Sequence, residues 1–306
     1  MENNFDVIIL GGGPAGLTAG IYLSRAKIKT LILNEGSIGG QMVLTHEIAN
    51  FPGVENISGF MLARTMKTQA QQFGCKIKSN VKITNIDLSG KEKTIEINNK
   101  DIFTSKTVII ASGGTARTLD IKGENKFKGR GVSYCATCDG DFYQDMDIVV
   151  VGGGNSALEE AVSLTKYAKT VTVVHQFDHF QAFEHAVQEA KANPKISFIL
   201  ESEPIEISGN EKVEKVIIEN QRTHEISEIK TDGVFVFVGY KANSEKFTGK
   251  VKTNEWGEIV TNDNRETNIE GVFAAGDVIE KRVRQITTAV GDATIAAMSC
   301  INYLQK

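Results

Sequence analysis

Two cysteines separated by two residues, Cys135 and Cys138, are followed directly by the carboxylate of Asp139. A Cys-x-x-Cys pair can alternate between dithiol and disulfide, because a thiolate of lowered pKa is both a nucleophile and a leaving group. A carboxylate beside a thiolate raises the pKa of both groups, which suits proton transfer near neutral pH. The pattern therefore predicts thiol–disulfide chemistry. The alternative, half of a zinc site, needs two further ligands, and the sequence has no second paired cluster.

A glycine-rich turn near the start of the chain predicts a dinucleotide site. It follows an apolar strand, opens a helix, and comprises Gly11, Gly12, Gly13, Pro14, Ala15 and Gly16. Glycines at the first, third and sixth positions let the backbone approach a pyrophosphate at a helix N-terminus. Glu35 stands roughly 20 residues further on, after the next strand, where an acid can accept hydrogen bonds from a ribose. The alternative is an ordinary βα turn without a ligand.

A second strand–turn–helix–strand pattern occupies residues 147–174. Its turn carries Gly152, Gly154 and Ala157, and its helix is predicted over Ser156–Tyr167. Two such patterns so far apart in the chain predict two nucleotide-binding domains rather than one large sheet.

Two apolar strands that run into Gly-rich segments, Val108–Arg117 and Val234–Glu245, are predicted to be crossovers between these domains. The second domain is then an insertion within the first. We expect an α/β fold of two Rossmann-like domains of the three-layer ββα type, with residues 1–114 and 246–306 in the first and residues 115–245 in the second.

The C-terminal segment returns to the first domain. The stretch Gly271–Val278 is predicted to place Asp277 at the end of a strand, and a helix is expected from near Thr287.

Composition restricts the class of protein. The 306 residues are 41% hydrophobic and 24% charged, which is ordinary for a globular protein with two cores. A formal net charge of -4 argues against a general nucleic-acid binder. No apolar run approaches the length of a membrane span, and the N-terminus has no signal-peptide pattern, so the expected location is the cytoplasm.

Motifs spread over both predicted domains resemble those of the low-molecular-weight thioredoxin reductases. They are GGGPAG at 11–16, GGQM at Gly39–Met42, EIANFPG at Glu47–Gly53, KGRGVSYCATCDG at Lys128–Gly140, VFAAGDV at 272–278 and the pair Arg284–Gln285. The resemblance implies FAD on the first domain, a redox-active disulfide on the second, thioredoxin as the substrate, and a homodimer whose domains rotate during turnover.

The same resemblance implies roles for individual residues. The ADP half of FAD would be held by the glycine turn and the acid after it, namely Gly11, Gly13, Pro14, Ala15, Gly16 and Glu35. The flavin would be lined by Gln41 and Asn50, and its pyrimidine edge would be approached by Arg284 and Gln285. Asp277 would meet the ribityl and pyrophosphate region. Cys138 would face the flavin, and Cys135 would attack the thioredoxin disulfide, with Asp139 carrying the proton.

One stretch departs from the NADPH-dependent members. Their second glycine turn is followed by His-Arg-Arg with a third Arg four residues later, whereas this chain reads HQFDHFQ over His175–Gln181. Each lost arginine–phosphate contact is worth about 1.5–3 kcal/mol, so NADPH binding should weaken by orders of magnitude. NADH is not an obvious replacement, because His175 and Gln176 stand where a NAD-selective unit has an acid.

The chain in this respect resembles the ferredoxin-dependent flavin thioredoxin reductases, which implies electrons from reduced ferredoxin. Basic residues that could meet an acidic ferredoxin form two clusters, one of Lys122, Lys126, Lys128 and Arg130 and one of Lys281, Arg282 and Arg284.

Other functions remain open on the sequence alone. They are a nicotinamide-dependent thioredoxin reductase with an atypical pocket, an oxygen-using flavin dithiol oxidase, and a flavin-bound redox sensor without turnover. A metal site at His175, Asp178, His179 and His185 is a further alternative; we expect none.

Overall fold

The computed structural model describes residues 3–45 and 48–306. Glu47, which opens the EIANFPG motif, lies outside these residues. The chain divides into two compact units, Met1–Thr115 with Lys241–Lys306 and Ala116–Tyr240. The expected junctions were 114/115 and 245/246. Two short strands that pair with each other, β7 (Gly114–Ala116) and β16 (Tyr240–Ala242), lie at the observed junctions.

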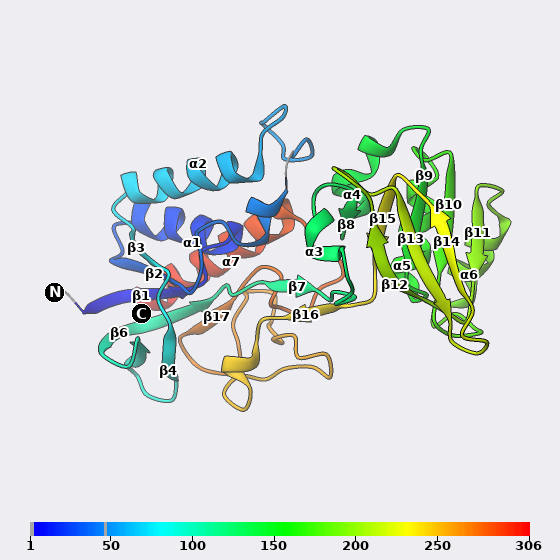
Figure 1. Ribbon diagram of the computed structural model, residues 1–306. Coiled ribbons are helices and arrows are strands. Elements are labelled where there is room, and N and C mark those ends of the chain that lie inside the picture. The colour runs from blue at the N-terminus through cyan, green and yellow to red at the C-terminus, as the bar shows by residue number, and fades with distance from the viewer. Residues whose placement is uncertain (1–2, 46–47) are drawn as a thin grey trace. The chain divides into compact units, whose positions relative to one another are not determined.

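The first unit is built on a sheet whose parallel strands run in the order β3 (Lys76–Ser79), β2 (Thr30–Asn34), β1 (Asn4–Leu10), β6 (Asp101–Ile110) and β17 (Val272–Ala274). The helices are α1 (Pro14–Arg25), α2 (Gly59–Gln72) and α7 (Ile286–Leu304), with the 3-10 turns η1 (Gly40–Leu44) and η3 (Glu245–Phe247). Antiparallel strands β4 (Ile83–Asp87) and β5 (Lys93–Ile97) extend from the first half of β6. Figure 1 shows α1, α2 and α7 on one side of this sheet.

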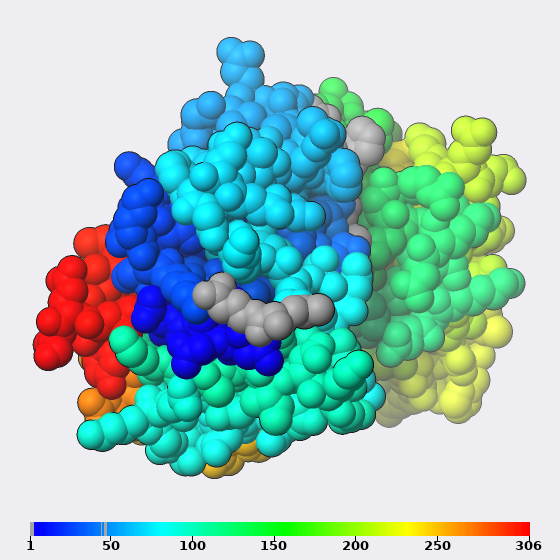
Figure 2. All heavy atoms as spheres, turned by 90° about the vertical axis from the view of Figure 1, so that its left-hand side faces the viewer, coloured from blue at the N-terminus to red at the C-terminus, as the bar shows by residue number. Residues whose placement is uncertain are grey.

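Strand β1 explains why this unit has layers on both faces. Val7 and Ile9 pack into a core with the helices, whereas Ile8 and Leu10 pack into a separate core with β4 and β5. All four are completely buried or nearly so. A continuous apolar run is what a parallel strand covered on both faces requires. On the surface of the unit, α1 lies beside α7 (blue and red in Figure 2).

The second unit repeats the plan. Its parallel sheet has the order β11 (Ile196–Ile199), β10 (Thr170–Val174), β9 (Asp147–Val151), β15 (Gly233–Val236) and β8 (Val132–Ser133). Helices α5 (Asn155–Leu164) and α6 (Glu184–Ala192) pack into the core on one face. An antiparallel sheet of β12 (Ser202–Ser208), β13 (Lys215–Asn220) and β14 (Ile226–Lys230) covers the other. Short helical turns are α3 (Glu124–Phe127), α4 (Ala136–Asp139) and η2 (Gly140–Tyr143).

The predicted fold class, two Rossmann-like α/β domains, is confirmed. Two local predictions need correction. Helix α5 ends at Leu164 rather than Tyr167, because the Thr165 hydroxyl bonds back to the Val162 carbonyl and closes the last turn. Asp277 does not end a strand: β17 stops at Ala274, and Gly276 then turns the chain with a φ of 80°.

Among the described residues, no helix has the length and apolarity that a membrane span needs.

Candidate functional site

The cysteine pair lies just beyond an edge strand of the second unit's parallel sheet. Strand β8 ends at Ser133, and Cys135 is the N-cap of the short helix α4. Cys135 and Cys138 are joined in a disulfide with their Cα atoms 5.3 Å apart. The other two cysteines of the chain, Cys75 and Cys300, are buried in the first unit, and burial raises the pKa of both thiols, so they are unreactive at neutral pH.

Asp139 is held by a hydroxyl that the sequence analysis did not single out. The Ser133 Oγ donates to Asp139 Oδ2 at 2.6 Å and accepts the Cys135 backbone N–H at 3.1 Å. Burial raises the pKa of Asp139, the Ser133 bond lowers it, and the charge on Asp141 raises it. A raised carboxyl pKa fits a group that both gives and takes a proton, and in the disulfide state its main cause is burial.

A fully buried carboxylate anchors the segment ahead of the disulfide. Glu124 accepts the Tyr134 hydroxyl at 2.7 Å and the backbone N–H groups of Leu119 and Asp120 at 3.0 and 2.8 Å. Burial, first, and the bond to Glu124 raise the pKa of Tyr134 far above its usual range. Because Tyr134 precedes Cys135, this network fixes the backbone from which the disulfide extends.

The first glycine turn has the close approaches of a pyrophosphate cradle. A Cβ on Gly11, whose φ is 119°, would lie 2.1 Å from the Ala111 carbonyl oxygen, and one on Gly16 would lie 1.9 Å from the Gly11 oxygen. Gly13 is the N-cap of α1, and Pro14 occupies the first turn of the helix. The N-terminus of α1 is thus presented to a ligand, so this turn fits a dinucleotide.

The polar group that contacts this turn is Asn34, not Glu35. At the end of β2, Asn34 Oδ1 accepts the Gly12 N–H at 2.8 Å. The Glu35 carboxylate instead accepts the Ile83 N–H at 3.0 Å and pairs with Lys246. Sequence reasoning passed over Asn34, although its place as the last residue of β2 is where a Rossmann unit has its ribose acid.

Two further segments expected around a cofactor meet the same turn. Gly40, which precedes Gln41 in η1, lies against Gly13, and a Cβ on Gly40 would be 3.2 Å from the Gly13 Cα. Gly276, which precedes Asp277, lies against Ala15, and its Cβ would be 2.8 Å from the Ala15 Cβ. Gln41 is exposed. Burial raises the pKa of Asp277, and the paired Lys281 lowers it.

Asn50, Arg284 and Gln285 also lie within the first unit. Asn50 Nδ2 donates to Gln285 Oε1 at 3.3 Å, and Gln285 is the N-cap of α7 with both bonds of a capping box to Thr288. Arg284 forms an ion pair with Glu258, a partner that the sequence gave no reason to select. Asn50, Arg284 and Gln285 therefore lie together at the N-terminus of α7.

The second glycine turn is overlaid by His175. A Cβ on Gly153 would lie 2.4 Å from the imidazole ring, which is 5% exposed and stacks on Phe180 with centroids 5.9 Å apart. Within the described residues the His175 Nε2 has no hydrogen-bond partner. Burial lowers the pKa of His175, so the ring is neutral at pH 7.

The stretch that follows, residues 176–181, contains no arginine or lysine. Phe177 packs against His175 and is 39% exposed, and Asp178 pairs with His179 at 2.6 Å in solvent. The fold does bring Arg222 near, from the hairpin of β13 and β14, but this guanidinium is exposed and pairs with Glu201 at 3.5 Å. From His175 to Gln181 the side chains include one carboxylate, Asp178, and no guanidinium.

The two basic clusters are largely engaged in internal bonds. Lys122 pairs with Glu206 at 3.1 Å, and Lys126 donates to the Gly209 carbonyl at 3.3 Å. Lys281 bridges Asp277 and Asp292. No group of three potential metal ligands occurs within the described residues.

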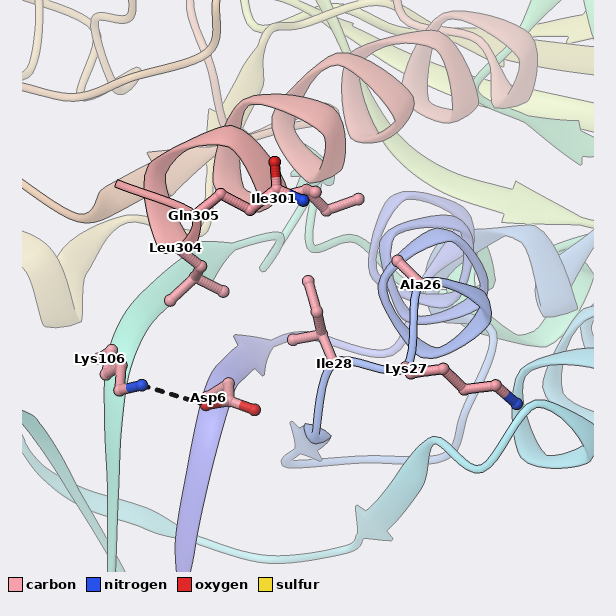
Figure 3. A pocket seen from close by; sticks show the side chains of 8 residues that line it. All are labelled: Asp6, Ala26, Lys27, Ile28, Lys106, Ile301, Leu304 and Gln305. Carbon is pink, nitrogen blue, oxygen red and sulfur yellow. Dashed lines mark ion pairs between the residues drawn. The ribbon is translucent and has the colours of Figure 1, made fainter.

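A cavity of about 220 Å³ lies elsewhere on the first unit (Figure 3). It is found at the N-terminal end of β1, away from the glycine turn, and the Asp6–Lys106 ion pair at 3.6 Å lies on its wall. None of the predicted site residues lines it.

Comparison with known proteins agrees with this arrangement. Residues 5–293 match the pyridine nucleotide-disulphide oxidoreductases. A 34.2 kDa protein in a rubredoxin operon of Clostridium pasteurianum is 46% identical over 303 residues, which cover 99% of this chain and 98% of that protein. The thioredoxin reductase of Bacillus subtilis is 44% identical, with coverage of 100% and 96%. The crystal structure of a thioredoxin reductase from Streptococcus pyogenes superposes with a TM-score of 0.94 at 42% identity and covers 100% of this chain and 99% of its own.

Proposed function

Because the chain belongs to the pyridine nucleotide-disulphide oxidoreductase family, we propose that it is an FAD-dependent thioredoxin reductase whose electrons come from reduced ferredoxin rather than NADPH. The enzyme class is supported by relatives named thioredoxin reductase that match over the whole chain. The electron donor is argued from the residues around the second glycine turn.

The first unit holds the FAD in this proposal. The turn from Gly11 to Gly16 and the N-terminus of α1 bind the pyrophosphate through backbone N–H groups. Asp277 faces the ribityl chain, and Gln41, Asn50, Arg284 and Gln285 border the isoalloxazine. Glu35 is assigned to the ribose by motif, whereas Asn34 is the last residue of β2, where a Rossmann unit has its ribose acid. When bound, FAD exchanges electrons singly or in pairs, and every other step belongs to the protein.

The second unit carries out the thiol–disulfide exchange with thioredoxin in this proposal. Reduction of the Cys135–Cys138 bond by two electrons and two protons gives two thiols. The Cys135 thiolate then attacks one sulfur of the thioredoxin disulfide and forms a mixed disulfide, and the thioredoxin thiolate that leaves is protonated. Cys138 attacks Cys135 next, which restores the enzyme disulfide and releases the second thioredoxin thiol. Asp139 carries the proton between these thiols, and burial raises the pKa of its carboxyl, which favours proton uptake.

The observation that carries the choice of donor is the absence of guanidinium groups at positions 176, 177 and 181, where Gln, Phe and Gln stand. The nearby Asp178, which pairs with His179, would repel a 2′-phosphate. A one-electron protein donor avoids this pocket entirely.

We further propose a homodimer that acts in the reducing cytoplasm. Tyr22 of α1 and Ile295 and Met298 of α7 are exposed apolar side chains on adjacent helices, and such a surface favours burial against a second copy. Sedimentation of the FAD-loaded protein gives the mass directly.

The deciding experiment compares donors anaerobically on the FAD-loaded protein. Photoreduced ferredoxin, NADPH and NADH are each supplied in turn, and bleaching of the flavin and thiol formation on thioredoxin are both followed. We expect ferredoxin to drive both signals and the nicotinamides to drive neither. Rapid bleaching by NADPH or NADH would establish the nicotinamide-dependent alternative. Oxygen uptake with a small dithiol, and no thioredoxin thiols, would establish the oxidase. Ferredoxin reduction of the flavin without any thioredoxin thiol would indicate a sensor.

A further inference from the structure

We propose that Ser133 is a positioning residue for proton transfer, which keeps Asp139 hydrogen-bonded to the Cys135 backbone in both its ionised and its neutral state. The proposal rests on the proposed function in one respect only, that the Cys135–Cys138 pair undergoes thiol–disulfide exchange.

The Ser133 hydroxyl proton can be donated to either of two acceptor oxygens. Its Oγ lies 2.6 Å from Asp139 Oδ2 and 3.3 Å from the Cys135 carbonyl oxygen, and it also accepts the Cys135 N–H at 3.1 Å. Ser133 is 4% exposed, so solvent does not compete freely for these bonds. A hydroxyl has one donor and two acceptor positions, which are enough for either arrangement.

The ionised state uses the first of these acceptors. The Ser133 O–H donates to the Asp139 carboxylate, a short charge-assisted bond. When Asp139 takes up a proton, its own O–H donates to Ser133 Oγ, and the Ser133 proton turns to the Cys135 carbonyl. The Cys135 N–H stays on Oγ throughout. Rotation of one hydroxyl therefore keeps the carboxyl oriented, and no heavy atom has to move.

This arrangement matters because Asp139 must change its protonation state twice in each turnover. A buried carboxyl that lost its partner in either state would pay the cost of an unsatisfied polar group. Cys135 is the nucleophile toward thioredoxin, and its backbone is bonded to the same Oγ as the proton carrier. The side chain of Ser133 thus holds both the backbone of the nucleophile, Cys135, and the carboxyl of the acid, Asp139, in fixed positions.

The charged groups around Asp139 are few. Asp141 and Tyr143 follow it in η2, and Asp141 raises the pKa of Asp139. On α5, which packs against α4, Glu160 interacts electrostatically with Glu159. On β15, the residue opposite Ser133 is the apolar Phe235. Loss of the Ser133 hydroxyl therefore removes the contact that lowers the pKa of Asp139 and leaves those that raise it.

The test measures exchange by the dithiol enzyme alone. FAD-loaded wild type and the variants S133A, S133T and D139N are reduced with dithionite and mixed with thioredoxin, and separately with a small aromatic disulfide, in a stopped-flow instrument from pH 5 to 9. No physiological donor is involved, so the result does not depend on ferredoxin. If thioredoxin does not react, the proposed function fails, and the small disulfide still reports the ionisation of Asp139.

We expect S133A to slow exchange about tenfold and to move the Asp139 limb of the pH profile up by about one unit, the equivalent of one charge-assisted hydrogen bond. S133T keeps the hydroxyl and should retain the wild-type profile. In a D139N background, S133A should change the rate less than about twofold, because the group that Ser133 serves no longer titrates.

Two results would overturn the proposal: an S133A profile that coincides with wild type, or an equal loss of rate with and without the Asp139 carboxyl. Flavin absorbance and far-UV circular dichroism establish that each variant is folded. If S133A does not fold, S133G replaces it, since glycine also lacks the hydroxyl and adds no thiol beside the disulfide. S133G must then give a shift in the same direction, and its absence would count equally against the proposal.

Discussion

Asn50 Nδ2 donates to Gln285 Oε1 at 3.3 Å, a bond between two residues 235 positions apart that the sequence assigned separately to the flavin. The same Gln285 side chain accepts the backbone N–H of Thr288 and caps α7. One glutamine thus fixes both a helix start and a residue of the cofactor site, which links the stability of α7 to cofactor binding.

Replacing this glutamine should therefore affect two properties. We expect Q285A to lower the free energy of unfolding by about 1 kcal/mol through loss of the cap and to weaken FAD binding as well. S58A is the matched control, because Ser58 caps α2 through a comparable bond to the Met61 N–H. Thermal unfolding and FAD titration of the apoprotein should show a similar stability loss in both variants and weaker FAD binding in Q285A alone. Equal FAD affinity would contradict the link.

The close approach at Gly16 predicts that an added methyl group disrupts the turn. We expect G16A to destabilise the protein by about 1–3 kcal/mol and to abolish tight FAD binding, because its Cβ would lie 1.9 Å from the Gly11 oxygen. Gly36 lies just after the next strand, and a Cβ there would meet nothing within 4 Å. G36A should therefore bind FAD like wild type. Flavin absorbance of the purified proteins reports both outcomes.

Asn34 and Glu35 allow a direct comparison of two neighbours. N34A removes the acceptor of the Gly12 N–H, so we expect FAD to bind several-fold more weakly. E35Q breaks an ion pair with Lys246 whose side chains are both 42% exposed, worth at most about 1 kcal/mol. Isothermal titration with FAD separates them. A larger loss in E35Q than in N34A would restore the ribose role that the motif assigns to Glu35.

Restoring three arginines should create a nicotinamide site if the glycine turn is otherwise intact. In the triple variant Q176R/F177R/Q181R we expect the rate of flavin reduction by NADPH to rise at least a hundredfold, since each contact contributes about 1.5–3 kcal/mol. A variant with three arginines at exposed positions of α2, Q69R/Q71R/Q72R, has the same added charge and should not respond. Thioredoxin reduction with ferredoxin should be similar in both. No gain in the first variant would show that the site is blocked for another reason.

His175 should make the second unit sensitive to acid. Its pKa in the folded protein lies below the ordinary value of 6.5 because the neutral ring is buried. A base with a depressed folded pKa contributes stability that is complete above the unfolded pKa, and that stability is lost as pH falls from about 6.5 toward the folded pKa. We expect the free energy of unfolding to fall over this window, measured by urea titration at each pH.

The variant H175N removes the titrating group from the turn and should flatten this part of the curve. H185N, at another histidine of the same unit whose side chain is exposed, is the control and should keep the wild-type slope. Asp139 contributes to the pH dependence of stability with the opposite sign, because a raised carboxyl pKa means that protonation favours the folded state. Both variants retain Asp139, so its contribution is the same in each. Identical slopes in H175N and wild type would contradict the assignment.

Much of the fold follows from local pattern. The sequence predicts the apolar run of β1, which is buried on both faces, and the glycine turn with Gly11 and Gly16. Both features depend on residues that are close together in the chain, so they can be recognised without a tertiary structure. The chemistry of the Cys135–Cys138 pair is predictable for the same reason, because both thiols and the carboxylate of Asp139 lie within five residues.

What the sequence alone could not decide is which partner each polar group takes. Glu35 stands at a plausible distance from the turn along the chain, yet its carboxylate pairs with Lys246, more than 200 residues away, and Asn34 contacts the turn instead. Ser133 meets Asp139 only because α4 turns the chain back toward the end of β8. Hydrogen bonds and ion pairs act over a few ångströms, whereas sequence patterns report spacing along the chain, so packing alone determines these contacts.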